Sequence, residues 1–130
     1  MTQKDLELIL LRQWAAHIQT PIWIAGVEGE LLFYNEPAEQ LLRRRFDEAG
    51  EMPLDQLAAL FNTATEDGRP VTSRDLPLGV ALSERRPAQG RLRVSALDGS
   101  VRLIDVTAVP IIAAGNRHLG AIVFFNEVMP

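Results

Sequence analysis

Apolar residues near the start of the chain repeat with helical spacing and predict a helix over residues 3–19. At about 100° per residue, their side chains occupy more than half of the helix circumference. A helix that packs on one core needs a stripe only about 100° wide. The excess apolar surface predicts that the helix has a second partner, and another copy of the chain is the simplest choice. The alternative is that the helix lies in a deep groove of its own domain. The apolar positions are Leu6, Leu8, Ile9, Leu10, Leu11, Trp14, Ala15 and Ile18.

A Thr-Pro pair separates this helix from a predicted β-hairpin. The helix ends before Pro21, because the residue preceding a proline is pushed out of the helical region. Apolar and β-branched residues then predict strands over residues 22–27 and 31–34, joined by a Glu-Gly turn. The side-chain oxygen of Asn35 suits the N-cap of a short helix over residues 36–42.

Two further short helices are predicted in the middle of the chain. The first covers residues 54–60. The second opens at Pro77, which suits the first helical turn because the missing N–H would be unpaired there anyway, and it stops before Pro87. An Asp-Gly pair at residues 67–68 predicts a polar turn, and residues 70–71 are expected to be extended.

The last third of the chain predicts three antiparallel strands, over residues 91–96, 101–109 and 119–125. The first two alternate apolar and polar residues, and the turns between the strands are Asp-Gly and Gly-Asn. The third is apolar on both faces. Such a strand is expected in the middle of a sheet or under a cover, for which the N-terminal helix is the obvious choice.

The order of these elements predicts an α+β domain: a five-stranded antiparallel sheet with short helices on one face and an N-terminal amphipathic helix. We expect residues 1–20 to form the dimerisation helix and residues 21–130 the core domain. The space between the helices and the sheet is either packed shut, which the density of such side chains favours, or holds a small apolar molecule. Its predicted lining is Ile24, Phe33, Leu42, Leu57, Leu60, Leu78, Leu82, Val94 and Val106.

Over about residues 8–129 the chain resembles the PAS family of sensory domains. The run LLFYNEPAEQLL is similar to the family's GrilyvNpaaeelL segment, and EDGRPV and LPLGVAL resemble a segment found in PAS domains of bacterial sensor kinases. DGSVRLIDVTAVPI and GAIVFFNEV resemble its two closing strands. The matching positions, in the first hairpin together with this run, are Gly29, Asn35, Ala38, Leu41 and Leu42. The resemblance implies the PAS fold and a role in signal transduction, including two-component systems.

Two departures from the family pattern bear on function. Arg43 stands where a glycine often follows the first helix, and Glu127-Val128-Met129 replaces the Asp-Ile-Thr trio that links the last strand to an effector. The chain ends at Pro130 without a kinase, cyclase or DNA-binding module. We therefore expect an excised or adaptor-like input domain.

The resemblance leaves the cofactor unknown. Relatives with flavin photochemistry need a cysteine, and this chain has none, so a covalent flavin is excluded. A heme is not expected, because the helix opened by Pro77 has no histidine; we expect His17 and His118 to be exposed polar residues. A non-covalent flavin stays open. Trp23 would be a reasonable neighbour for it, although a surface or interface position is the favoured interpretation.

Composition narrows the remaining classes of function. The net charge of −4 argues against nucleic-acid binding, and no apolar run reaches the roughly 18 residues of a membrane span. The N-terminus lacks a signal-peptide pattern, so a cytoplasmic location is expected. Nucleophile motifs, phosphate-binding glycine loops and metal-ligand spacings are absent from the sequence, and we expect no catalytic residues, no metal and no enzymatic activity.

The sequence thus predicts a sensory or protein-interaction module that forms a homodimer and regulates an effector absent from this chain, such as a histidine kinase. The alternative is a sensor whose pocket binds a metabolite, flavin or heme. We expect the dimer contact at Leu10, Leu11, Trp14, Ile18, Phe124 and Phe125.

Overall fold

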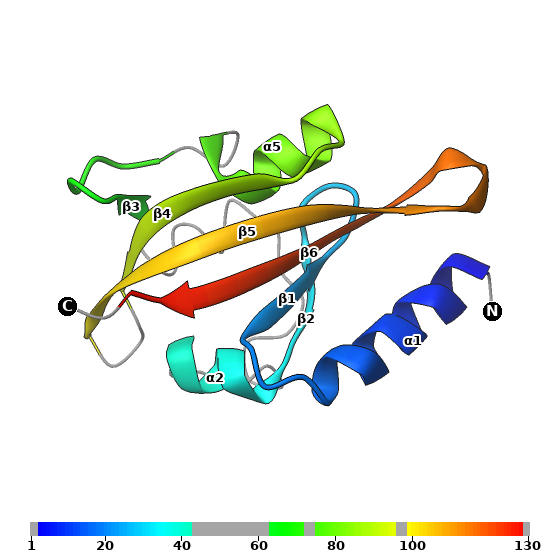
Figure 1. Ribbon diagram of the computed structural model, residues 1–130, viewed down its shortest axis with the longest axis horizontal. Coiled ribbons are helices and arrows are strands. Elements are labelled where there is room, and N and C mark those ends of the chain that lie inside the picture. Colours follow the sequence, from blue (N-terminus) through cyan, green and yellow to red (C-terminus); the bar gives the residue numbers. More distant parts are fainter. Residues whose placement is uncertain (1–2, 43–62, 72–74, 96–98, 129–130) are drawn as a thin grey trace.

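The body of the molecule is a six-stranded antiparallel sheet with the strand order β2-β1-β6-β5-β4-β3 (Figure 1). It is seen in a computed structural model that describes residues 3–42, 63–71, 75–95 and 99–128. The strands are β1 (Ile22–Ala25), β2 (Leu31–Tyr34), β3 (Ala64–Thr65), β4 (Ala88–Ser95), β5 (Val101–Ala113) and β6 (Arg117–Glu127). The helices of the described part are α1 (Gln3–Ala16), α2 (Glu36–Leu42), α5 (Pro77–Glu84) and the one-turn 3₁₀ helix η2 (Ala114–Asn116). The predicted α+β class is confirmed.

The sheet has one strand more than the five predicted. In the additional strand β3, Ala64 pairs with Arg93 and Thr65 pairs with Leu92. Ala64 also forms an isolated bridge with Pro70. A strand of two residues has no alternation of its own, so the hydrophobic pattern gives no signal for it.

Strand β6 lies between β1 and β5, so the prediction of a central position for the strand that is apolar on both faces is confirmed. Strands β5 and β6 form a long hairpin that closes at Gly115 (φ 75°) and Asn116 (φ 60°). Both residues adopt the left-handed conformation that glycine and asparagine tolerate best. The hairpin extends beyond the predicted strands, to Ala113 on one side and Arg117 on the other.

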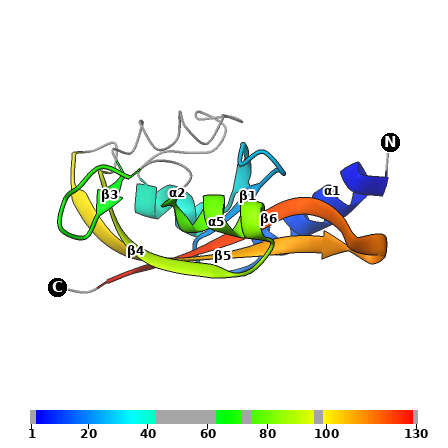
Figure 2. The ribbon, with the colours of Figure 1, turned by 90° about the horizontal axis from the view of Figure 1, so that it is seen from above.

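Side chains alternate between the two faces of the sheet and form two separate hydrophobic clusters. The inner cluster lies on the side of α2 and α5, which share one side of the β4–β5 surface (Figure 2). Its buried members are Ala25, Leu31, Tyr34, Ala38, Leu41, Leu76, Leu78, Ala81, Leu92, Val94, Ile104, Val106, Ala108, Ala121, Val123 and Phe125. The outer cluster joins α1 to the other face and comprises Leu8, Leu11, Ala15, Ile18, Ile22, Ile24, Leu32, Phe33, Ile122 and Phe124.

The short helices agree with the sequence where the structure describes them. Helix α2 occupies the predicted residues 36–42. Helix α5 begins at Pro77 and ends at Glu84, with Arg85 as its C-cap in the left-handed conformation (φ 54°). Helix α1 ends at Ala16 rather than at residue 19. The helix predicted over residues 54–60 lies outside the described residues. Within the described part, no helix combines the length and apolar character needed to cross a bilayer.

Candidate functional site

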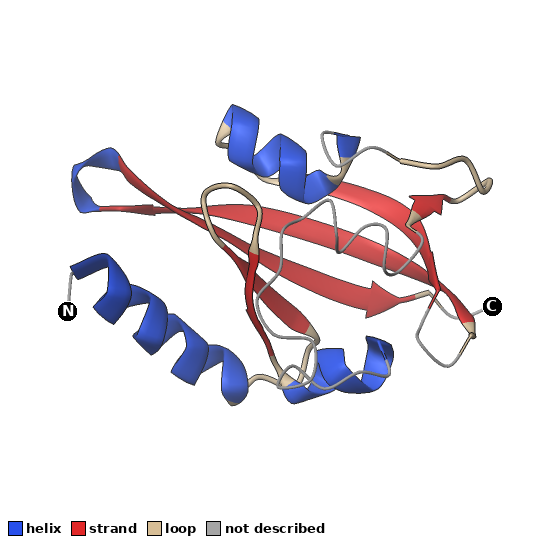
Figure 3. Ribbon diagram, turned by 180° about the vertical axis from the view of Figure 1, so that it is seen from behind, coloured by secondary structure: helices blue, strands red, loops and turns tan. Residues whose placement is uncertain are grey.

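Helix α1 is held against the outer face of the sheet by one side of its apolar surface. Leu8, Leu11, Ala15 and Ile18 belong to the outer cluster, where Ala15 is fully buried. The helix runs beside the β5–β6 hairpin and the β1–β2 hairpin in views from both sides (Figures 1 and 3). The prediction that the N-terminal helix covers the central strand is confirmed, because Ile122 of β6 packs in the same cluster.

A second side of α1 is apolar and exposed. Leu6, Leu10 and Trp14 are spaced four residues apart, which places them along one edge of the helix, and they are 49%, 55% and 46% exposed. Ile9 is 37% exposed on the same half of the helix. We call these four residues the exposed face of α1. Monomeric proteins rarely leave such large apolar side chains together in water, so this surface is a candidate contact site.

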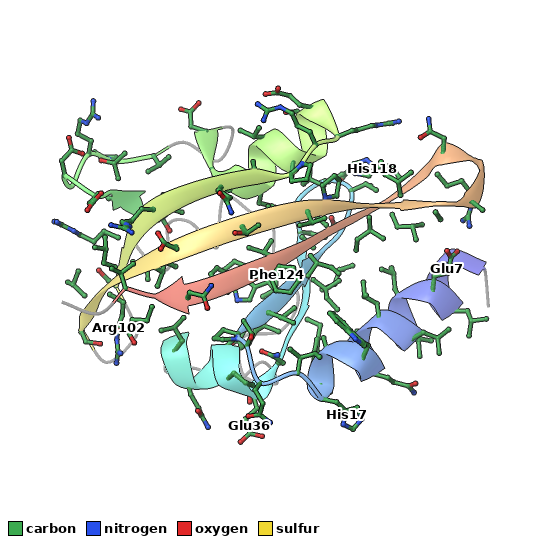
Figure 4. All side chains as sticks on the ribbon, in the orientation of Figure 1. Glu7, His17, Glu36, Arg102, His118 and Phe124 are labelled. Atoms are coloured by element: carbon green, nitrogen blue, oxygen red, sulfur yellow. The ribbon has the colours of Figure 1, made fainter. Side chains whose placement is uncertain are left out.

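Polar contacts hold the position of α1 near both of its ends. The guanidinium of Arg12 lies 5.0 Å from the centre of the Phe33 ring, within the range of a cation–π contact. At the other end, Glu7 accepts a hydrogen bond from Arg117 at 2.9 Å, which ties the helix to the tip of the β5–β6 hairpin. Figure 4 shows Glu7 at the hairpin end of the helix and His17 at its opposite end.

Asn35 joins α1, β1 and α2 through one buried side chain, which is 1% exposed. Its Oδ1 accepts hydrogen bonds from the backbone N–H of Ile22 (3.0 Å) and of Ala38 (3.2 Å), the latter as the predicted cap of α2. Its Nδ2 donates to three carbonyl oxygens at and after the end of α1, at 2.9–3.3 Å. These carbonyls belong to Ala15, Ile18 and Thr20. One asparagine thus caps the end of one helix and the start of another.

The structure separates the six residues predicted at the dimer contact. Leu10 and Trp14 lie on the exposed face of α1. Leu11, Ile18 and Phe124 are half-buried in the outer cluster, between α1 and the sheet. Phe125 is 4% exposed in the inner cluster, so its predicted place in the dimer contact is wrong. Neighbouring strand residues point to opposite faces, and Phe124 takes the outer one. Leu6 and Ile9 were missed, although their helical spacing from Leu10 and Trp14 was the available signal.

The residues predicted to line one internal space belong to two different clusters where the structure describes them. Leu78, Val94 and Val106 are buried in the inner cluster, and Leu82 packs against it. Ile24 and Phe33 are paired across β1 and β2 and belong to the outer cluster, so their predicted place in this space is wrong. Leu57, Leu60 and the side chain of Leu42 lie outside the described residues. The inner face of the first hairpin carries Trp23 and Tyr34 instead.

Trp23 is half-buried and packs against the inner cluster, which corrects its predicted surface or interface position. Its ring lies edge-on to Phe125 with the centroids 4.8 Å apart, and it is tilted against Tyr34 at 6.3 Å. His17 is exposed as predicted, whereas His118 is half-buried beside Ile112 in the β5–β6 hairpin. Binding of a ligand in the inner cluster stays a prediction.

The outer face of β4 and β5, away from α1, carries paired charges. Arg91 donates from Nε to Asp105 at 2.8 Å, and this hydrogen bond lowers the pKa of the Asp105 carboxyl. A second ion pair lies at the end of the sheet on the opposite face: Arg102 of β5 contacts Glu127 of β6 at 2.9 Å, and these residues pair in register with Val94 and Ile104 of the inner cluster. Among the described residues, no group of three or more metal-ligating side chains comes together. This part of the surface therefore has the character of a solvated sheet face.

Comparison with known proteins decides the family. A family model described as the PAS fold matches residues 10–128, which is most of the chain. The chain belongs to the PAS family. Comparison with curated protein sequences gave no match.

Solved structures of PAS domains share this fold at low sequence identity. The PAS domain of a Colwellia psychrerythraea protein has a TM-score of 0.69 at 16% identity and covers 94% of this chain and 97% of its own. The PAS domain of nitrogen regulation protein NR(II) from Vibrio parahaemolyticus has a TM-score of 0.65 at 19% identity, covering 92% and 98%. That of the fruit-fly ELK potassium channel has a TM-score of 0.72 at 8% identity, covering 93% and 96%. This PAS domain therefore shares its fold with domains from proteins of very different kinds.

Proposed function

We propose that this PAS domain is a non-catalytic input module that forms a homodimer through α1 and regulates an effector module, such as a histidine kinase. The observation that carries the proposal is the exposed face of α1, where four large apolar side chains lie together on a helix already anchored to the sheet. Similarity to PAS domains of nitrogen regulation protein NR(II) and of a two-component sensor histidine kinase supports the choice of output. The cytoplasmic location stays a prediction.

The composition of the exposed face favours a protein partner. Trp14 is of the residue type most enriched at the energetic centres of protein interfaces, and Leu6 and Leu10 supply flat apolar area beside it. Because the opposite side of α1 is buried on the sheet, a partner would meet a surface of fixed orientation. A second copy presents the same apolar stripe, so an isologous contact covers both at once.

The hydrogen bonds of Asn35 supply a route from the core of the domain to this contact. Ala38 and Leu41 of α2 pack in the inner cluster, and Asn35 links the first turn of α2 to the end of α1. A ligand or partner that favours one position of α2 would therefore bias the position of α1. A coupling of this kind amounts to about 1–3 kcal/mol and requires different affinity for two states.

The test of the proposed dimer is a double substitution on the exposed face, Leu10→Glu with Trp14→Glu, measured by analytical ultracentrifugation. We expect the wild type to sediment as a dimer and the variant as a folded monomer. A matched control is Arg91→Glu with Arg93→Glu, which places two glutamates on the exposed side of β4, away from α1. A wild type that stays monomeric at high concentration, or a variant that stays dimeric, contradicts the proposal.

A further inference from the structure

Strand β4 has an edge that the rest of the sheet leaves open. All eight of its residues pair with β5 on one side, but β3 pairs only with Leu92 and Arg93 on the other. Residues Ala88–Arg91 have no strand partner on this second side among the described residues. In an antiparallel strand, every second residue points its N–H and C=O away from a given neighbour. Within the part of the chain that the structure describes, this stretch therefore presents backbone groups without a strand partner, as an edge strand does.

The open edge lies in a groove of about 760 Å³ between two walls. One wall is α5, with Pro77 and Val80, and the other is the segment after β3, with Pro70 and Val71. In Figure 1, β3 and α5 lie at different points along the same side of β4. Ala88 and Gly90 have little or no side chain on the inner face of the open stretch. Their side chains therefore do not shield the backbone of this stretch.

The shape of this groove fits a single extended chain better than a second copy of the domain. Two identical edges pair only if both protrude, and this edge lies between α5 and residues 70–71. The open stretch of four residues is roughly 13 Å long at about 3.3 Å per residue, which matches a strand of similar length. The chain itself already places a short extended segment, β3, on the adjoining part of the same edge.

The charges of the groove indicate the character of that chain. Arg69, which follows β3, and Arg86, which precedes β4, line the groove near its two ends, and their side chains are 77% and 59% exposed. Among the described residues, each pairs with an acid two residues away, Asp67 or Glu84, and such surface pairs are weak enough to be exchanged for another carboxylate. Asp75 is the one acid among the groove residues that the structure describes. The described lining itself thus carries two arginines against one aspartate, while Asp67 and Glu84 lie outside it; once these exposed pairs are exchanged, the lining favours an acidic segment.

We propose that the groove between β3, β4 and α5 binds an extended acidic segment of a partner protein, which pairs with β4 at Ala88–Arg91 as an added strand. Main-chain hydrogen bonds to the open edge provide the affinity, and Val80 and Val71 contact alternate side chains of the segment. Carboxylates of the segment meet Arg69 and Arg86. This site is separate from the exposed face of α1 and works whether or not the domain dimerises.

The test selects peptides from a random twelve-residue display library on the wild-type domain. We expect enriched peptides with β-branched residues at alternate positions and Asp or Glu nearby. Their amide shift changes should map to residues 88–92 and to both walls of the groove. Two methylated versions of a selected peptide test the pairing, one with methyl groups on the backbone nitrogens of its odd positions and one on those of its even positions. Only alternate N–H groups of an added strand face β4, so one version should lose binding and the other should keep it.

Charge variants provide the control. Arg69→Gln with Arg86→Gln should weaken binding of a selected acidic peptide roughly tenfold, the loss expected for a charge-assisted contact. Arg102→Gln with Arg117→Gln removes the same net charge outside the groove and should leave binding unchanged. The proposal is overturned if no peptide is enriched, if the binders map to the exposed face of α1, or if both double variants weaken binding equally. It is also overturned if a Leu10→Glu/Trp14→Glu domain self-associates and Val80→Glu abolishes that association, because the edge would then be a self-contact.

Discussion

The side-chain Nδ2 of Asn35 donates a hydrogen bond of 2.9 Å to the carbonyl oxygen of Thr20, fifteen residues earlier in the chain. The last carbonyls of a helix have no partner within the helix. Asn35 also donates to the carbonyl of Ala15 in the last turn of α1 and to that of Ile18 just after it. The same side chain caps α2 through Ala38. The positions of two helices on opposite faces of the sheet therefore depend on one residue.

We expect Asn35→Ala to lower the free energy of unfolding by about 2–4 kcal/mol, because buried backbone groups lose their partners. Urea unfolding measures this loss. Asn126→Ala is the matched control, since Asn126 is exposed on β6 and its loss should cost less than about 0.5 kcal/mol. Equal effects of the two substitutions would contradict the role assigned to Asn35.

Asn35→Asp separates the two halves of this role. An aspartate keeps the acceptor for the N–H groups of Ile22 and Ala38 but cannot donate to the carbonyls at the end of α1. We expect faster hydrogen exchange in α1 and unchanged protection at the start of α2. Similar changes in both helices would argue against separate links.

The two sides of α1 should respond differently to truncation. Leu11→Ala removes a side chain packed in the outer cluster, and we expect a loss of about 1–3 kcal/mol in thermal or urea unfolding. Leu10→Ala removes a neighbour that is 55% exposed, and in dilute, monomeric protein it should cost less than about 0.5 kcal/mol. At high concentration Leu10→Ala should instead weaken association. The reverse order of the two stabilities would show that α1 is rotated from the position described.

Gly120 should not accept even an alanine. Its φ of 137° is disfavoured for other residues, and a Cβ at this position would collide with the carbonyl oxygen of Ala25 on β1. We expect Gly120→Ala to destabilise the domain by more than about 2 kcal/mol in urea unfolding. Gly115→Ala is the control, because Gly115 also has a positive φ (75°) but open space around its Cβ position, and its cost should be near 1 kcal/mol. A smaller cost at Gly120 than at Gly115 would contradict the close approach of β1 and β6.

Phe125→Ala should cost about 3–5 kcal/mol, because it leaves a cavity in the inner cluster beside Trp23. It should also weaken the near-ultraviolet circular dichroism of Trp23, whose ring lies edge-on to Phe125. Phe124→Ala, the control on the other face, should leave that signal unchanged and loosen α1 instead. A loss of the Trp23 signal in both variants would contradict the separation of the two clusters.

Arg91→Gln should raise the pKa of Asp105 toward its ordinary value, because the hydrogen bond from Arg91 is the main cause of its lowered pKa. With a lowered folded-state pKa, this contact stabilises the folded protein above the unfolded-state pKa of the carboxyl, and the contribution is lost as the pH falls through the folded-state pKa. Carboxyl-carbon NMR titration of wild type and variant measures the shift. Asp67 is the control: its lowered pKa depends on Thr65 and Arg69 and should not move. An unchanged Asp105 pKa would rule out this cause.

Apart from β3, local patterns in the sequence were sufficient for the order of the described elements and for several of their ends. Pro77 and Arg85 bound α5, the Gly-Asn turn closes the β5–β6 hairpin, and Asn35 caps α2. Each of these features depends on residues close together in the chain, through turn conformation, proline geometry or a cap. The family resemblance rests on the same local motifs in their correct order.

The tertiary structure decided which face each strand residue occupies and which partners lie far away in the sequence. Strands β1, β2 and β6 carry apolar residues in both phases, so their pattern did not show which residues face which side. The sequence-based choice put Ile24 and Phe33 on the wrong face and left Phe124 and Phe125 unseparated. A shift of one residue exchanges the two faces, and only pairing with distant strands selects between them. The additional strand β3 and the bonds from Asn35 to the end of α1 were likewise beyond reach of the sequence, because each joins segments that meet only after the chain has folded.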